Sequence, residues 1–596
     1  MRNRRGCRPG NARISSSDAR NESAYVSSAV SPRFIGVVVV VTLAAVWQQS
    51  AAQEKLNDKK QPENRRVEFR SAFKDSAAPS RHIPTPKIDL PDFVITGNAS
   101  IDLPNVEKEI VQEEGAKSVV GPSSAAHVRG RETIGVAVGN KEAIGGTAGA
   151  RHTGKAIGGI GMYSSPRAGV WFGQDLGYAH YSLVGRYFLS KGFASNTDCS
   201  GGSLYFGGGT LIESAMWLLN KAHVDGRFEY ASDSYKWYGT QSPSMGRNQE
   251  SFSAAVTLTN WSNTTVPYTG DLEYKNFVVT DSTDSVTEHQ LNFGAKAILT
   301  VASVSLTAGL NMRLTSLTGS ISASLPYADG FLGSQRYVWD RISLQGSIHL
   351  YLASGVEDQR LFRAYPHLDV ACRISPIHSA RLEYRPEVKA GSLSSRLENH
   401  RYLSGMSLQK HEDTQHDLAL GVESSWSSEM RTRFSIKWQS SVDQPLYSDI
   451  PSKGIWFLVY EGRTTKTSFS AEIFAKFLAN DYFASKVSVN LTRISITGGE
   501  VPYIPLVEVS GSYTRSLTEQ IRVTSTLALV VQRKDNVVNA STLGNIVLLG
   551  ARGEYQALNQ VSLYLDVQNL LDRKYEFWRG YQEIPLVLSA GLSFHW

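Results

Sequence analysis

Apolar and polar residues alternate along most of the chain after residue 165. In the stretch SARLEYRPEVKA, residues 379–390, every second side chain is apolar or aromatic and most of those between are charged. A period of two places the two sets on opposite faces of a β-strand, whereas a helix repeats its apolar residues every three or four positions. About 20 segments share this pattern, among them HQLNFGAKAILTV, RISLQGSIHLYL and MRTRFSIKW. The pattern predicts an all-β protein.

The number of strands distinguishes an open sheet from a closed one. Open sheets rarely reach this size, and closure removes the unpaired edges. A barrel this wide cannot fill its interior with its own side chains. Because inward apolar faces would leave such an interior unfilled, the pattern favours apolar side chains toward lipid and charged ones toward a wet lumen. We predict a large closed antiparallel transmembrane β-barrel of about 20–22 strands over residues 165–596.

Connections between the expected strands differ in length. Outer-membrane barrels have short periplasmic turns and longer outer loops, and counting back from a C-terminus on the periplasmic side keeps the assignments consistent to about residue 466. This alternation fails around 441–466 and near 316–361. The short turns are 479–481, 517–519 and 557–560, and the longer loops are 494–503, 533–545 and 571–584.

Tryptophans stand near many expected strand ends. Such positions fit the aromatic girdles of the two membrane interfaces, although scattered surface aromatics would look similar. The residues are Trp261, Trp339, Trp426, Trp456, Trp578 and Trp596.

One long apolar run lies outside this pattern. FIGVVVVVTLAAVW, residues 34–47, is too short for a membrane-spanning helix but has the length of a signal-peptide core, and small residues follow it. We expect residues 1–52 to be a leader and signal peptide. They hold seven arginines and two acidic residues, which is five of the net six positive charges, so the basic balance does not indicate a nucleic-acid partner.

The segment VQNLLDRKYEFWRGYQEIPLVLSAGLSFHW, residues 567–596, resembles the C-terminus of TonB-dependent outer-membrane receptors. That family carries Asn-Leu-Phe-Asp, a nearby Tyr, an aromatic-Gly-Tyr stretch, a Pro, and a last strand ending in Phe or Trp. Leu571 stands where the family has Phe. The matching residues are Asn569, Leu570, Asp572, Tyr575, Gly580, Tyr581, Pro585 and Trp596.

The resemblance implies a location in the lipid of the bacterial outer membrane. It also implies that the barrel-assembly machinery recognises one face of the last strand. That face comprises Leu588, Ala590, Leu592, Phe594 and Trp596.

A second resemblance lies near the N-terminus, in a segment similar to the TonB box, which pairs as an added strand with the protein TonB. A short apolar patch in a flexible segment is the alternative. The segment comprises Asp92, Phe93, Val94, Ile95, Thr96 and Gly97.

Polar composition predicts that residues 53–130 form a flexible periplasmic segment. The Gly/Ala-rich stretch 131–164 is either a plug remnant or the first strands. Family members carry a plug domain between TonB box and barrel, and residues 98–164 are too few for one. The sequence therefore predicts a receptor-like barrel with a degenerate or absent plug.

Charged faces of neighbouring strands are expected to form a ladder in the lumen, with Asp417 and Glu423 on a strand between them. Mixed charge of this kind would hold a folded-in segment by ion pairs or bias passing anions, and a solvated wall of weak pairs is the alternative. The ladder comprises Arg381, Glu383, Arg385, Glu387, Lys389, Arg431, Arg433 and Lys437.

No grouping of catalytic or metal-binding residues is recognisable in the sequence. GARHTGKA, residues 149–156, is similar to a phosphate-binding loop but lacks its final hydroxyl, and the 13 histidines form no close ligand pair. We therefore expect no enzyme activity, cofactor or metal site.

The predicted function is transport or binding of a solute, either a small molecule or a metal chelate, across the outer membrane. The first alternative is a non-transporting surface protein, an adhesin or assembly scaffold. Its partner-binding loops would be 191–220, 390–414 and 571–584. A membrane-embedded hydrolase is a third possibility.

Overall fold

The computed structural model describes residues 152–596. Within that range it leaves out residues 215, 217–218, 261–265, 283, 302–303, 450–453, 479–480 and 539–540. The expected leader, the flexible segment and the TonB-box-like residues lie outside the described residues. Across the part of the chain that is described, no helix is both long and apolar enough to cross a bilayer.

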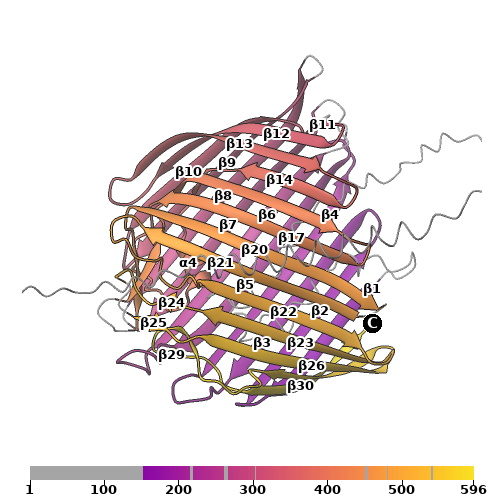
Figure 1. Cartoon of the computed structure of the whole chain (residues 1–596), viewed down its shortest axis with the longest axis vertical. Coiled ribbons are helices and arrows are strands. Elements are labelled where there is room, and N and C mark those ends of the chain that lie inside the picture. Colours follow the sequence, from indigo (N-terminus) through magenta and orange to yellow (C-terminus); the bar gives the residue numbers. More distant parts are fainter. Residues whose placement is uncertain are drawn as a thin grey trace, which may run out of the picture. The chain divides into compact units, whose positions relative to one another are not determined.

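Twenty-two long strands, each antiparallel to its neighbours, form one closed sheet (Figure 1). The positions of these strands follow the alternation of apolar and polar side chains. One strand is interrupted at Pro386, which has no N–H to donate and separates β14 from its continuation β15. The strands are β1 (His152–Gly161), β2 (Ser165–Asp175), β3 (Ala179–Ser190), β4 (Cys199–Ile212), β5 (Ala222–Lys236), β6 (Gly246–Asn260), β7 (Tyr268–Asp281), β8 (Ser285–Val301), β9 (Val304–Gly319), β10 (Ala323–Ser334), β12 (Ile342–Ser354), β13 (Arg360–Arg373), β14 (His378–Tyr384) with β15 (Glu387–Lys389), β16 (Glu412–Ser425), β17 (Met430–Val442), β20 (Arg463–Leu478), β21 (Asp481–Ile494), β22 (Val507–Ser516), β23 (Ile521–Val531), β26 (Ile546–Leu558), β27 (Val561–Gln568) and β30 (Val587–His595).

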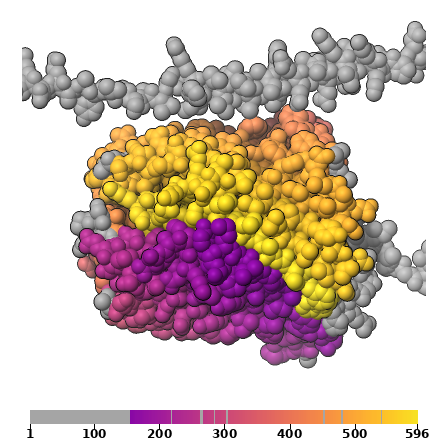
Figure 2. All heavy atoms as spheres, turned by 90° about the horizontal axis from the view of Figure 1, so that it is seen from below, coloured from indigo at the N-terminus to yellow at the C-terminus, as the bar shows by residue number. Residues whose placement is uncertain are grey.

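The barrel closes where its first strand meets its last. β1 pairs with β2 on one side and with β30 on the other, from Lys155 opposite His595 to Gly161 opposite Ser589. Figure 2 shows this seam as the indigo N-terminal strands lying against the yellow C-terminal ones. The predicted closed barrel is thus confirmed, with a strand number at the upper end of the expected range. The first described strand of the barrel starts at His152 rather than at residue 165. It lies inside the stretch 131–164, for which the sequence allowed either a plug remnant or the first strands.

The outer surface of the barrel is apolar. On β12, Ile348, Leu350 and Leu352 are 60%, 48% and 56% exposed, while Tyr351 and Ala353, which point to the opposite face, are buried. On β30, the side chains of the expected assembly face are exposed and Ser589 and Ser593 are buried. Exposed apolar surface on this scale is unfavourable in water by about 25 cal/mol per Å², so this face requires lipid around it.

The two ends of the barrel carry different connections. We call the end that holds Trp596 the inner end and the opposite one the outer end. Figure 1 shows α4, β24, β25 and β29 gathered at the outer end, away from the C-terminus. The short elements of the outer end are α4 (Leu393–Asn399), β18 (Leu446–Asp449), β19 (Trp456–Val459), β24 (Arg533–Lys534), β25 (Thr542–Leu543), β28 (Glu576–Trp578) and β29 (Tyr581–Gln582), and β11 (Tyr337–Trp339) lies at the inner end.

The structure explains where the alternation of turn lengths failed. Near 316–361 the outer turn 320–322 is short, whereas the inner connection 335–341 is longer and contains β11. Around 441–466, β18 and β19 pair with each other as a hairpin and with no strand of the barrel wall. The loop expected at 191–220 was also wrong, because its central part is β4, a strand of the wall. Short extended segments carry the same local signal whether or not they join the main sheet.

Candidate functional site

Several outer-end connections pack together on one buried aromatic cluster. We call the described residues of these connections the cap; they fall within 237–245, 390–411, 443–462, 495–506, 532–545 and 569–586. The aromatic side chains at its centre are at most 3% exposed, which buries a large apolar area at the mouth of the barrel. They are Trp237, Tyr402, Trp456, Tyr503, Trp578 and Tyr581.

Parts of the cap meet across the mouth. The connection 237–245 follows the fifth strand of the ring and 443–462 follows the fifteenth, so they start from nearly opposite sides of a 22-strand barrel. They approach so closely that a Cβ on Gly454 would lie 2.4 Å from the carbonyl oxygen of Gly239. The hydroxyl of Tyr581 donates to the carbonyl oxygen of Gly454 at 2.8 Å. The cap is therefore held together by contacts that bridge the mouth.

Arg247 on β6 anchors the cap to the barrel wall. Its fully buried guanidinium donates to both carboxylate oxygens of Asp281 at 2.6 Å. It also donates to the carbonyl oxygens of Arg401 and Leu403 at 3.1 and 2.5 Å, and it lies 4.1 Å from the ring centroid of Trp237. One side chain thus joins the wall, the segment 390–411 and the aromatic cluster.

A second anchor fixes α4. Glu288 on β8 is fully buried and accepts hydrogen bonds from the backbone N–H groups of Leu393 and Ser394 at 2.8 and 2.9 Å. These N–H groups start the helix and have no partner within it, so the carboxylate satisfies them. The segment 390–411 leaves the wall at the thirteenth strand but is tied to the sixth and eighth, which means that it crosses part of the lumen.

His400 lies inside the aromatic cluster as a neutral ring. It stacks on Trp578 with ring centroids 3.2 Å apart, and its Nδ1 accepts a hydrogen bond from the N–H of Tyr402 at 3.2 Å. Burial lowers the pKa of His400 well below its ordinary value of 6.5, and the positive charge of Arg247 lowers it further. A protonated ring would lose the acceptor at Nδ1, so the closed cap requires the neutral form.

Acidification is therefore expected to loosen the cap. In an opened cap the pKa of His400 returns toward 6.5, so the open form binds the proton, and closure becomes less favourable as the pH falls below that value, by about 1.4 kcal/mol per pH unit until the closed-state pKa is reached. Hydrogen exchange in residues 393–411, corrected for the intrinsic rate, should be faster at pH 5 than at pH 7.5. His400→Phe should reduce this difference, and equal protection at both pH values in the native chain would contradict the expectation.

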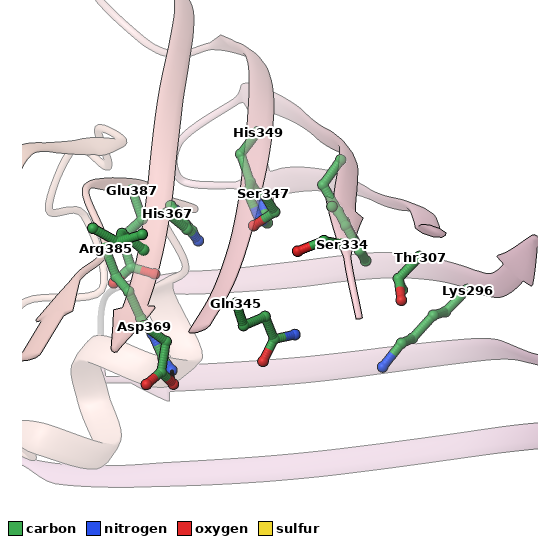
Figure 3. A pocket seen from close by; sticks show the side chains of 13 residues that line it. Lys296, Thr307, Ser334, Gln345, Ser347, His349, His367, Asp369, Arg385 and Glu387 are labelled. Atoms are coloured by element: carbon green, nitrogen blue, oxygen red, sulfur yellow. Dashed lines mark hydrogen bonds and ion pairs between the residues drawn. The ribbon is translucent and has the colours of Figure 1, made fainter. Parts of the chain in front are cut away.

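A polar pocket of about 380 Å³ lies in the wall of the lumen. Its side chains come from β8, β9, β10, β12, β13 and the β14–β15 junction. Figure 3 shows Lys296 and Thr307 on one side of the pocket and His367, Asp369 and Arg385 on the other. The pocket offers charges of both signs and imidazole nitrogens, so it suits a polar ligand with several hydrogen-bonding groups.

The lumen charge ladder makes its ion pairs within the wall. Asp369 on β13, which the sequence did not single out, accepts from Arg381 at 2.5 Å and from Arg385 at 3.0 Å. Glu383 lies 2.8 Å from Arg381. Lys389 lies 3.2 Å from Glu412 and 3.9 Å from Glu387.

The basic side chains in the second half of the ladder also form their ion pairs within the wall. β16 lies between β14 and β17, so Glu423 and Asp417 face the basic side chains of β17. Arg433 and Arg431 lie 2.8 and 3.8 Å from Glu423, and Lys437 lies 2.9 Å from Asp417. These basic side chains are 41–49% exposed, and pairs of this kind contribute up to about 1 kcal/mol each.

Sequence reasoning missed the residues of the cap. Trp456 and Trp578 were expected in interfacial girdles, but they are buried at the centre of the cap. Trp339 and Trp596 are 81% and 42% exposed at the inner end, as girdle residues would be. Arg247 and Glu288 carried no signal in the sequence, because their partners lie 34 or more residues away.

A closed wide barrel with an apolar outer surface, a charged lumen and inward-packed outer connections defines a bacterial outer-membrane β-barrel. No protein-family model matches the chain, and no curated protein matches its sequence.

Solved structures of iron and siderophore receptors are similar to it. The ferric-catecholate import receptor Fiu of Escherichia coli K12 aligns with a TM-score of 0.57 and 10% identity, over 74% of this chain and 81% of that one. The FrpB iron transporter of Neisseria meningitidis gives 0.60 and 9%, over 75% and 82%. A mutant of the ferric enterobactin receptor PfeA of Pseudomonas aeruginosa gives 0.56 and 12%, over 76% and 81%. The likeness establishes the fold, and the receptor-like barrel expected from the C-terminal resemblance is confirmed.

Proposed function

We propose that this protein is an outer-membrane receptor that binds a solute at the cap and passes it through the lumen. The observation that carries the proposal is the cap itself, in which connections from nearly opposite sides of the ring meet over a polar lumen. A permanently open pore needs an unobstructed mouth, whereas a mouth bridged by packed connections admits a solute when they move. The names of the similar structures, an import receptor and an iron transporter among them, support this reading.

We infer that the solute is a metal chelate such as a ferric siderophore. The similar structures include receptors named for ferric catecholate, ferric enterobactin and ferric yersiniabactin. The polar pocket in the lumen wall offers hydrogen-bonding groups and charges of both signs, which suit the polar groups of such ligands. Paired charges along the ladder suit a polar passage without a strong preference for anions.

Uptake of radioactive iron by cells that lack their own siderophore receptors tests this function. Cells that express this chain should accumulate iron from at least one ferric chelate in a panel of catecholates, hydroxamates and citrate. Deleting residues 92–97 should abolish that uptake and leave the amount of folded barrel unchanged, because the proposed TonB contact lies in this segment. Uptake without these residues would indicate passive passage.

A panel that yields neither uptake nor binding to the purified protein would contradict the proposal. Such a result would favour the alternative of an adhesin or assembly scaffold. Against that alternative, two of its three expected partner-binding loops belong to the cap and bury their large apolar side chains there, among them Leu393, Tyr402 and Trp578. A displayed loop would leave such side chains on the surface.

A further inference from the structure

Three side chains that commonly bind metal ions converge on the lumen wall near the inner end. His180 on β3, His223 on β5 and Asp225 on β5 each offer one ligand atom, and these atoms all lie within 4.8 Å of one another. His223 Nδ1 lies 2.7 Å from one carboxylate oxygen of Asp225, and His180 Nε2 lies 3.5 Å from the other. The imidazole rings are stacked with centroids 5.6 Å apart.

Strand pairing produces this cluster. His180 lies opposite Gly209 on β4, and Gly209 lies opposite Asp225 on β5, so the three positions form one row across three strands. A Cβ on Gly209 would lie 2.2 Å from an oxygen of Asp225 and within 2.9 Å of both imidazole rings. The glycine therefore provides the space into which the three side chains lean.

The cluster faces the lumen rather than lipid. Tyr187, Phe206 and Tyr230, which have the opposite parity on the same strands, are exposed on the apolar outer surface. The three side chains are 40–48% exposed, which leaves room for water to complete a coordination sphere.

We propose that His180, His223 and Asp225 bind a divalent transition-metal ion, with Zn²⁺ as the representative. Ligand distances of about 2.0–2.2 Å place the donor atoms of a tetrahedral zinc site about 3.3 Å apart, close to the separation of His180 Nε2 and Asp225 Oδ1. Two imidazoles and one carboxylate are a ligand set that zinc accepts while keeping a fourth position open for water. The ordinary alternative is a carboxylate that only forms hydrogen bonds with two histidines.

This site does not depend on the proposed uptake function, because it can be measured with the purified full chain and the ion alone. Untagged protein in detergent should bind one Zn²⁺ per chain in calorimetry, and Co²⁺ in its place should give the visible absorption of a tetrahedral site. Losing even an outer-shell partner weakens metal sites about 10–100-fold, so His180→Ala and His223→Ala should each weaken binding at least as much.

His349→Ala is the matched control. His349 also contacts a carboxylate, Asp329, at 3.0 Å in the same lumen, but it does not belong to the cluster. This variant should bind Zn²⁺ like the native chain. A closed barrel resists unfolding in detergent unless it is heated, and this resistance would be checked for every variant. If His180→Ala failed to form a closed barrel, His180→Gln would replace it. Absence of stoichiometric binding in the native chain, or unchanged affinity in the closed His180 and His223 variants, would overturn the proposal.

Discussion

Replacing Arg247 by alanine is expected to release the cap from the barrel wall. The substitution removes four hydrogen bonds. The carboxylate of Asp281 then keeps the longer contact from the indole N–H of Trp237 at 3.3 Å, and the carbonyl oxygen of Leu403 loses the guanidinium donor. Breaking one partner of a buried ion pair typically costs about 3–5 kcal/mol. Because the sheet closes through its own ladder of hydrogen bonds, the loss should fall on the cap. Hydrogen exchange of residues 390–411 should rise steeply, and planar bilayers should show larger conductance than with the native chain.

Arg227→Ala on the neighbouring strand β5 is the control for this experiment. The Arg227 side chain is 55% exposed and pairs with Glu273 at 3.0 Å, so its removal should change protection of the cap little. Arg247→Lys should give an intermediate result, because it keeps the charge but cannot donate to the carboxylate and two carbonyls in the same geometry. If Arg247→Ala left exchange and conductance at native values, the anchoring role would be wrong.

Substituting Trp596 by alanine is expected to impair assembly of the barrel in the outer membrane. The indole lies over Gly154, where an added Cβ would come within 2.1 Å of the ring, and it stacks on Phe594 with centroids 5.7 Å apart. It therefore covers the seam between β1 and β30, where Trp596 and Gly154 exchange backbone hydrogen bonds of 2.9 and 3.1 Å. Because the side chain is partly exposed, we expect a loss of about 1–2 kcal/mol at the seam.

This effect is measured as the amount of folded barrel in outer-membrane fractions. The folded form is distinguished by its resistance to unfolding in detergent without heating. Gly154→Leu should produce a similar defect from the other side of the seam, because the new side chain meets the indole. His595→Ala, which leaves the apolar face of β30 unchanged, is the control. Native amounts of folded barrel with Trp596→Ala would reduce this residue to ordinary packing at the membrane interface.

The wall of the barrel could be predicted from the sequence because alternation is a local property. A strand with one face in lipid repeats every two residues wherever its partners lie, so β12, β14 and β17 were recognisable individually. The count was uncertain where β11 and the β18–β19 hairpin imitate wall strands. Local pattern does not tell whether an extended segment joins the main sheet, since that depends on the partners available in space.

The cap and the proposed metal site could not be predicted in the same way. His180 and Asp225 lie opposite the same glycine of β4, and only the register of two strand pairs shows this. His400 and Trp578 come from connections of different hairpins, and neither sequence neighbourhood indicates a stack. Such sites depend on contacts between distant segments, for which a single sequence carries no periodic signal.

The unequal lengths of the outer connections determine which part of the chain is accessible to molecules outside the cell. Turns such as 162–164 and 320–322 are only three residues long, whereas five of the six connections of the cap follow residue 389. Antibodies, phages and toxins approaching from outside would therefore meet mainly residues 390–586. Selection by such agents can vary that region while the strands from β1 to β13 stay constrained by lipid and by their neighbours. Sequence variation among strains should thus concentrate in the C-terminal part of the chain.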